Sequence, residues 1–154
     1  MDGSDVPIME PEKTTWGEKT AFYCHKTGGP TLRYMILVSI TTKRFLWISD
    51  AFPGGTSEAR IVTETVWDKF LPGERILGDS LFSAPAYMHI FTTPMRAQDQ
   101  ASYEILSSIR AAVEHSFEQI KNFSIARSRY RSTDYEFHEI CMRVICRIIN
   151  LTRK

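Results

Sequence analysis

The 154-residue sequence lacks the patterns that mark several common classes of protein. It has no run of about 18 apolar residues, and its first ten residues have neither the basic flank nor the apolar centre of a signal peptide. We therefore expect a soluble, intracellular protein without a membrane partner. The three cysteines have no zinc-ligand spacing, which predicts free thiols. No Ser/His/Asp nucleophile set, P-loop or dinucleotide fingerprint is present, which sets those classes aside.

The charge that is present is unevenly distributed. The net charge is only +1, but from residue 110 onward nine Lys/Arg stand against five Asp/Glu, so the rest of the chain is slightly acidic. Such asymmetry is typical of a basic surface that faces a polyanion, and also of an ordinary solvated helix face. With 43% hydrophobic residues, the length fits one domain over residues 1–154.

The pattern of apolar residues predicts an α/β fold with a mixed sheet and flanking helices. Residues 2–9 indicate a first strand, and residues 32–40 and 44–48 a buried hairpin, which gives three antiparallel strands. Between the first strand and this hairpin, residues 12–30 are typical of a loop with a small strand near 21–23. The later predicted elements are a helix capped by Thr56 or Ser57 and ending before Pro72, short strands at 75–78 and 88–92, and helices at 98–123 and 134–151.

The last helix has the clearest periodicity. Its apolar residues recur at i, i+3, i+4, i+7, i+8, i+11 and i+12, which predicts that this face packs on the core. The residues are Phe137, Ile140, Cys141, Val144, Ile145, Ile148 and Ile149.

Three acidic residues occupy positions that suit chemistry. Asp2 begins the first strand, Asp79 ends a buried one, and Glu114 lies beside the apolar stripe of its helix. Paired divalent cations that cleave phosphodiesters need carboxylates converging from different elements. Each acid taken alone also fits an ordinary cap or turn residue.

The segments around these acids resemble the catalytic domain of Harbinger-like DDE transposases. Ser4 stands where the family has Thr, Glu58 where it commonly has Asp, and Leu81 and Phe82 replace its usual Gly and Tyr. The matching segments are residues 2–8, which begin with Asp2-Gly3-Ser4, residues 45–56, residues 76–82, which contain Gly78-Asp79-Ser80, residues 108–121, which contain Arg110 and Glu114, and residues 141–151.

The resemblance implies an RNase H-like fold, with three antiparallel strands followed by α-β-β. It implies metal-dependent DNA cleavage and strand transfer in the nucleus, with Mg²⁺ or Mn²⁺ held by Asp2, Asp79 and Glu114. The family usually carries an N-terminal DNA-recognition region, which this sequence lacks, so a separate DNA-recognition protein is an expected partner. A homo-oligomer is left open.

Basic residues near the third acid are candidates for binding the DNA backbone. Arg110 and Lys121 share a helical face with Glu114, although Arg110 could instead form a helical salt bridge with Glu114. The stretch after the helix has no acid and contains the aromatic residues Phe123 and Tyr130, as a DNA track would; a solvated loop is the alternative. The candidate contacts are Arg110, Lys121, Arg127, Arg129 and Arg131.

Two further interpretations remain open. One is a catalytically inactive, domesticated or remnant transposase domain that binds DNA or protein. The other is an RNase H-like nuclease that acts on RNA or hybrids. The intact acids favour the enzyme, and the changes after Asp79 favour the remnant.

Overall fold

The central element is a long strand that pairs on both sides. The computed structural model describes residues 1–11 and 16–153, and in it strand β3 (Gly29–Val38) pairs antiparallel with β1 (Asp2–Pro7) and with β4 (Phe45–Ile48). Short strands β2 (Tyr23–Cys24) and β5 (Phe52–Pro53) extend the same sheet along β3. The prediction of three antiparallel strands is confirmed.

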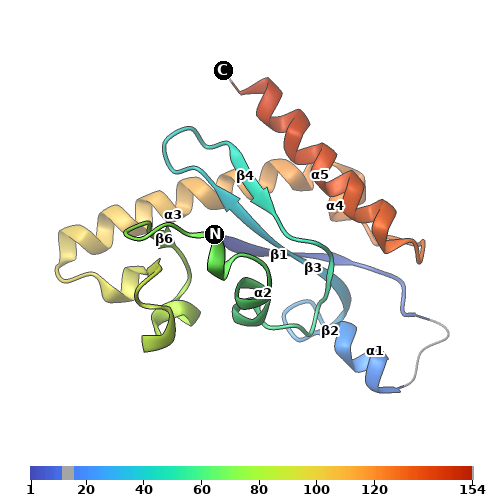
Figure 1. Ribbon diagram of the computed structural model, residues 1–154. Helices are drawn as coiled ribbons and strands as arrows, with labels where there is room; N and C mark the ends of the chain where they lie inside the picture. Colours follow the sequence, from blue (N-terminus) through green and yellow to red (C-terminus); the bar gives the residue numbers. More distant parts are fainter. Residues whose placement is uncertain (12–15, 154) are drawn as a thin grey trace.

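Strand β3 carries buried apolar residues on both faces because it separates two cores. Leu32, Tyr34 and Ile36 point into a main core with helices α3 (Gln100–Lys121) and α5 (Tyr135–Thr152). Met35 points into a second core with helix α2 (Glu58–Thr65). Figure 1 shows the corresponding layers, with α3 and α5 on one side of the sheet and α2 on the other.

The predicted helices form, and each has a side-chain N-cap. Ser57, Asp99 and Asp134 accept hydrogen bonds from backbone N–H groups in the first turns of α2, α3 and α5. Helix α2 ends at Thr65 instead of near Pro72, and a 3-10 turn over Trp67–Lys69 follows it.

The second half of the predicted sheet is smaller than expected. Strands β6 (Ile76–Leu77) and β7 (Phe91–Thr92) form a separate two-stranded parallel sheet, with 3-10 turns over Ser80–Ser83 and Pro85–Tyr87 between them and over Pro94–Arg96 after them. The strand predicted at 88–92 is therefore shortened. The backbone N of Met1 donates a hydrogen bond of 2.8 Å to the Leu77 carbonyl, which places the start of β1 beside β6.

Two short helices were not predicted. Helix α1 (Trp16–Phe22) lies where a loop with a strand near 21–23 was expected, and residues 12–15 of that loop lie outside the described residues. Helix α4 (Ser124–Arg127) follows α3. Both are too short for a periodic pattern to reveal them, and packing stabilises them: Phe22 contacts the Tyr135 ring, and Ala126 is in the main core.

The predicted core face of α5 was partly wrong. Ile145 and Ile149 are buried, but Phe137, Ile140, Val144 and Ile148 are exposed. The buried face is rotated, and it includes His138, Met142 and Cys146. Apolar periodicity identified the helix correctly, but the apolar stripe is wider than the surface that the sheet and α3 cover.

The buried histidine of α5 is held in a neutral form. Tyr34 donates its hydroxyl hydrogen to Nδ1 of His138 over 2.7 Å, and Nε2 of His138 donates to the Ile125 carbonyl over 3.1 Å. Burial lowers the pKa of His138, although the bond to Ile125 opposes this. This pair ties α5 and the α4 segment to β3.

The three cysteines are free thiols, as predicted. No helix in the described part of the chain is long and apolar enough to cross a membrane.

Candidate active site

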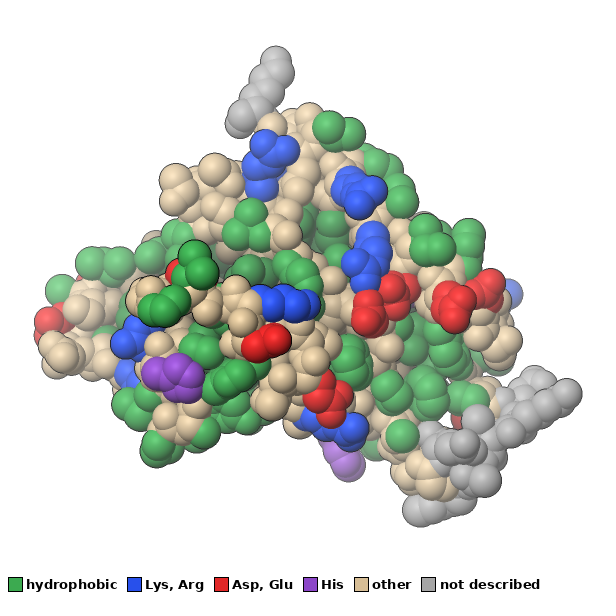
Figure 2. Space-filling view, in the orientation of Figure 1, with side chains coloured by type: hydrophobic (Ala, Val, Ile, Leu, Met, Phe, Trp, Pro, Cys, Tyr) green, Lys and Arg blue, Asp and Glu red, His purple; other side chains and the backbone are tan. Residues whose placement is uncertain are grey.

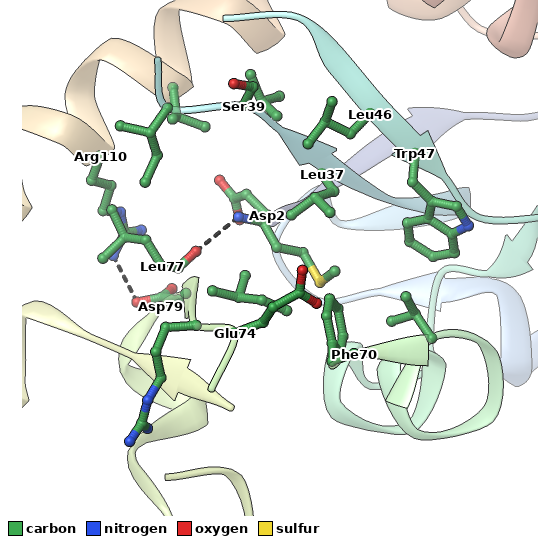
Figure 3. A pocket seen from close by; sticks show the side chains of 18 of the residues that line it. Asp2, Leu37, Ser39, Leu46, Trp47, Phe70, Glu74, Leu77, Asp79 and Arg110 are labelled. Carbon is green, nitrogen blue, oxygen red and sulfur yellow. Dashed lines mark hydrogen bonds and ion pairs between the residues drawn. The ribbon is translucent and has the colours of Figure 1, made fainter. Parts of the chain in front are cut away.

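Three acids from distant parts of the sequence line one cavity. Asp2 is the first residue of β1, Asp79 follows β6 after Gly78, and Glu114 lies in the middle of α3. Together they border a cavity of about 470 Å³ (Figure 3). The bond between Met1 and Leu77 places Asp2 near Asp79, so the two strands deliver their acids to the same edge.

Arg110 forms ion pairs with two of the three acids, Asp79 and Glu114. Its Nη1 donates to Oδ1 of Asp79 over 2.9 Å, and its Nε donates to Oε1 of Glu114 over 2.9 Å. Figure 3 shows its side chain directed at Asp79. The hydrogen bond from Arg110 holds the pKa of Asp79 below its usual range. The helical salt bridge considered for Arg110 and Glu114 is therefore present, with Asp79 as a second partner.

Asp2 has a different electrostatic environment from Asp79. Its Oδ1 accepts a hydrogen bond of 2.8 Å from the N–H of Gly3. Burial raises the pKa of Asp2, and the Gly3 hydrogen bond and the Arg110 charge oppose the rise. Asp2 is therefore a partly desolvated carboxyl group without an ion-pair partner among the described side chains.

Glu58 is a fourth acid, close to Asp2, and no catalytic role was predicted for it. It is in the first turn of α2, where its carboxylate lies against the backbone of Gly3. A β-carbon added to Gly3 would come within 2.5 Å of Oε1 of Glu58, so a glycine is what lets the acid approach. Burial raises the pKa of Glu58, and the charge of Asp2 adds to the effect. One signal in the sequence could have indicated this acid: Glu58 stands where the resembled family commonly has Asp.

A fifth acid nearby is neutralised. Asp5 accepts hydrogen bonds from Nε and Nη2 of Arg33, at 2.8 and 3.0 Å, and both side chains are largely buried. Nη1 of Arg33 donates to the Thr56 carbonyl over 2.8 Å. This buried ion pair links β1, β3 and the loop before α2, and so fixes where Glu58 enters the site.

The acids lie where three hollows meet. Besides the cavity of about 470 Å³, one of about 340 Å³ is bordered by Asp79 and Glu114, and one of about 240 Å³ by Asp2 and Glu114. Glu114 therefore borders all three. The largest is mainly apolar, with Leu37, Leu46 and Trp47 on the wall formed by β3 and β4 (Figure 3).

The predicted basic residues divide into two groups. Lys121 borders the smallest hollow together with Asp2 and Glu114, so it lies close to the acids as predicted. Arg127, Arg129 and Arg131 are exposed, but none of them borders these three hollows.

The two aromatic residues of that stretch pack partly against the protein itself. Phe123 and Tyr130 are partly buried against the main core. The Tyr130 hydroxyl donates to the Asp134 carbonyl over 2.9 Å, and its ring packs edge-on against His138. Both rings therefore contribute to packing, and their role in a DNA track stays a prediction.

The acids fit a divalent metal in chemistry but not in their present arrangement. Carboxylate oxygens are the ligands that Mg²⁺ and Mn²⁺ prefer. Yet within residues 1–11 and 16–153 no three His, Cys, Asp or Glu side chains form a group that could hold an ion. Asp79 and Glu114 are instead both paired with the guanidinium of Arg110.

The comparisons with known proteins agree with this chemistry. A family model described as DDE superfamily endonuclease matches residues 1–152. No curated protein and no solved structure matches the chain. Because the match spans nearly the whole sequence and the structure is a mixed α/β fold consistent with such a nuclease, the chain belongs to the DDE superfamily endonuclease family.

Proposed function

We propose that the chain is a Harbinger-like, metal-dependent DNA endonuclease of the transposase type, with Asp2, Asp79 and Glu114 as its catalytic acids. The observation that carries the proposal is the convergence of these three residues, from β1, the end of β6 and α3, on one cavity of a DDE superfamily endonuclease. The bond from Met1 to Leu77, which sets β1 beside β6, supports an RNase H-like arrangement of the strands.

The metal would be Mg²⁺ or Mn²⁺ held by the three acids. When bound, such ions activate water and stabilise the leaving oxygen in phosphodiester cleavage. For this to occur, Arg110 must release Asp79 and Glu114, and both ion pairs are partly exposed, which makes the exchange inexpensive. Once released, the Arg110 guanidinium lies beside the acids as a donor for a DNA phosphate.

The DNA would run along the side of the site that α3 forms. Lys121 lies beside Asp2 and Glu114, about three turns along α3 from Arg110, and its exposed side chain is available to a phosphate backbone. The exposed residues Arg127, Arg129 and Arg131 continue the basic surface beyond the helix. As a DNA-processing enzyme, the protein would act in the nucleus, with a separate DNA-recognition protein as its partner.

The second candidate is an inactive domain of the same origin that binds DNA or protein. One observation favours it: Arg110 already neutralises two of the three acids. Of the two changes after Asp79, Phe82 has a packing role, because its ring stacks on Phe91 in the second core.

Cleavage of labelled DNA separates the candidates. We expect wild-type protein to nick plasmid and linear duplex DNA with Mg²⁺ or Mn²⁺ but not with EDTA. Asp79→Asn and Glu114→Gln should lower the rate at least a hundredfold, whereas Glu104→Gln, a matched exposed acid on α3, should leave it unchanged.

Three other outcomes would contradict the proposal. Binding of DNA without cleavage would support the inactive domain. Cleavage confined to RNA or hybrids would support the third interpretation. Activity that survives both Asp79→Asn and Glu114→Gln would show that these acids are not catalytic.

A further inference from the structure

Helix α5 exposes a continuous apolar stripe. Phe137, Ile140, Val144, Ile148 and Leu151 have between 42% and 82% of their surface exposed, while the opposite face of the helix is buried in the main core. No charged residue interrupts the stripe. Figure 2 shows hydrophobic side chains along the upper right edge of the molecule, where Figure 1 places α5.

The spacing within the stripe is symmetric about its centre. Successive members are three, four, four and three residues apart, with Val144 in the middle. When two copies of such a helix lie antiparallel across a two-fold axis at Val144, Phe137 of one meets Leu151 of the other, and Ile140 meets Ile148. Two-fold interfaces require this kind of self-complementary surface, in which residue i contacts j and j contacts i.

The size of the stripe also suits a second copy. It runs from Phe137 to Leu151, which are 14 residue steps or about 21 Å apart along α5. Its five side chains expose on the order of 500 Å² of apolar surface, which is near the upper limit for the largest patch on an ordinary monomer. Two copies paired through the stripe would bury about 1,000 Å² in total, which is near the lower bound for a specific interface and suits a weak, reversible dimer.

The position of the stripe leaves the candidate active site open. In Figure 1, α5 runs along the upper right of the molecule, whereas β6 lies to the left and the start of β1 near the centre. None of the five stripe residues borders the hollows around the acids. A second copy bound to α5 therefore does not block DNA from those acids.

We infer that the chain forms a two-fold symmetric dimer through antiparallel packing of α5 against α5 of a second copy. The inference does not depend on the proposed nuclease function, since it uses no residue of that site. It predicts a dimer whose stability depends most on Val144, because this residue meets its own copy at the axis.

Sedimentation equilibrium of the full 154-residue chain tests the inference. We expect a reversible dimer in the micromolar range. Val144→Glu should raise its dissociation constant at least tenfold, because two carboxylates would face each other in an apolar interface. Leu71→Glu, a matched change at a residue with 68% exposure outside α5, should not affect it. A monomer throughout this range, or a dimer indifferent to Val144→Glu, would overturn the inference.

Cross-linking then tests the antiparallel register. All variants carry Cys141→Ser, because the remaining Cys24 and Cys146 are buried. When the Phe137→Cys protein is mixed with the Leu151→Cys protein, a short bis-maleimide that spans packed helices should cross-link the two chains. Phe137→Cys alone and Leu71→Cys mixed with Leu151→Cys should give at least tenfold less product. Equal yields from all three would contradict the register, even if each variant folds and dimerises.

Discussion

Replacing Arg110 by Met should tighten the binding of Mn²⁺. Arg110 forms one ion pair with Asp79 and one with Glu114, and the three side chains are 35%, 41% and 52% exposed. Partly exposed ion pairs contribute about 0.2–1 kcal/mol each, so a metal ion that displaces the guanidinium forfeits about 0.5–2 kcal/mol. Met is also unbranched and has a similar helix propensity, but it carries no charge. The expected gain in affinity is therefore about 2- to 30-fold.

Calorimetric titration with Mn²⁺ measures this change. Arg60→Met is the matched control, because Arg60 forms an i to i+4 ion pair with Glu64 on an exposed face of α2. It should leave the Mn²⁺ affinity unchanged. A DNA-binding assay on the same proteins should show the opposite sign for Arg110→Met, since the variant loses a phosphate donor beside the acids.

The result that would refute this reasoning is an Mn²⁺ affinity in Arg110→Met that is equal to or weaker than that of the wild type. Equal affinity would mean that the ion does not bind between Asp79 and Glu114. Weaker affinity would mean that Arg110 orients the two acids for the metal instead of competing with it.

Three further changes test the fold that supports the site. Asn150→Ala should lower the free energy of unfolding in urea by about 1–3 kcal/mol, because the amide both accepts from the N–H and donates to the C=O of Phe45, each over 2.8 Å. An unchanged urea midpoint would contradict it. Asp5→Ala should cost about 3–5 kcal/mol in the same assay, because it leaves the buried charge of Arg33 unpaired, and Asp5→Asn should cost less. Burial lowers the pKa of His138 below 6.5, so the unfolded chain takes up this proton first as pH falls, and stability should decline below about pH 6.5. His138→Gln should flatten that part of the profile of melting temperature against pH, and a slope identical to wild type would exclude His138 as its source.

The elements with the strongest local signals were predicted correctly. Three local patterns led to elements of the expected type: the β-branched and aromatic run of β3, the cap Ser57 of α2, and the apolar stripe of α3. Local preference and tertiary packing agree at these positions, so sequence pattern alone is sufficient.

The parts that failed depend on contacts between distant residues. Strands β6 and β7 have only two residues each, and much of the chain between them forms 3-10 turns. The face of α5 that is buried depends on how the sheet and α3 meet it, which periodicity does not specify. The sequence showed that α5 is amphipathic, but not that its apolar stripe exceeds the surface available within one chain.

The candidate site shows the same division. The resemblance identified Asp2, Asp79 and Glu114, and the i to i+4 spacing suggested the pair of Arg110 and Glu114. The bond from Arg110 to Asp79 joins residues 31 positions apart, and no sequence pattern encodes it. The approach of Glu58 to Gly3 likewise follows from how α2 packs against β1.

The most direct test of the central claim is to map a bound metal by its own chemistry. Fe²⁺ binds carboxylate sites of this kind, and with ascorbate and peroxide it cleaves the polypeptide near the bound ion. If Asp2, Asp79 and Glu114 share one metal site, mass spectrometry of the fragments should show cuts near residues 2, 79 and 114, all suppressed by excess Mg²⁺. Cuts elsewhere, or at only one of these positions, would show that the three acids do not form a common site.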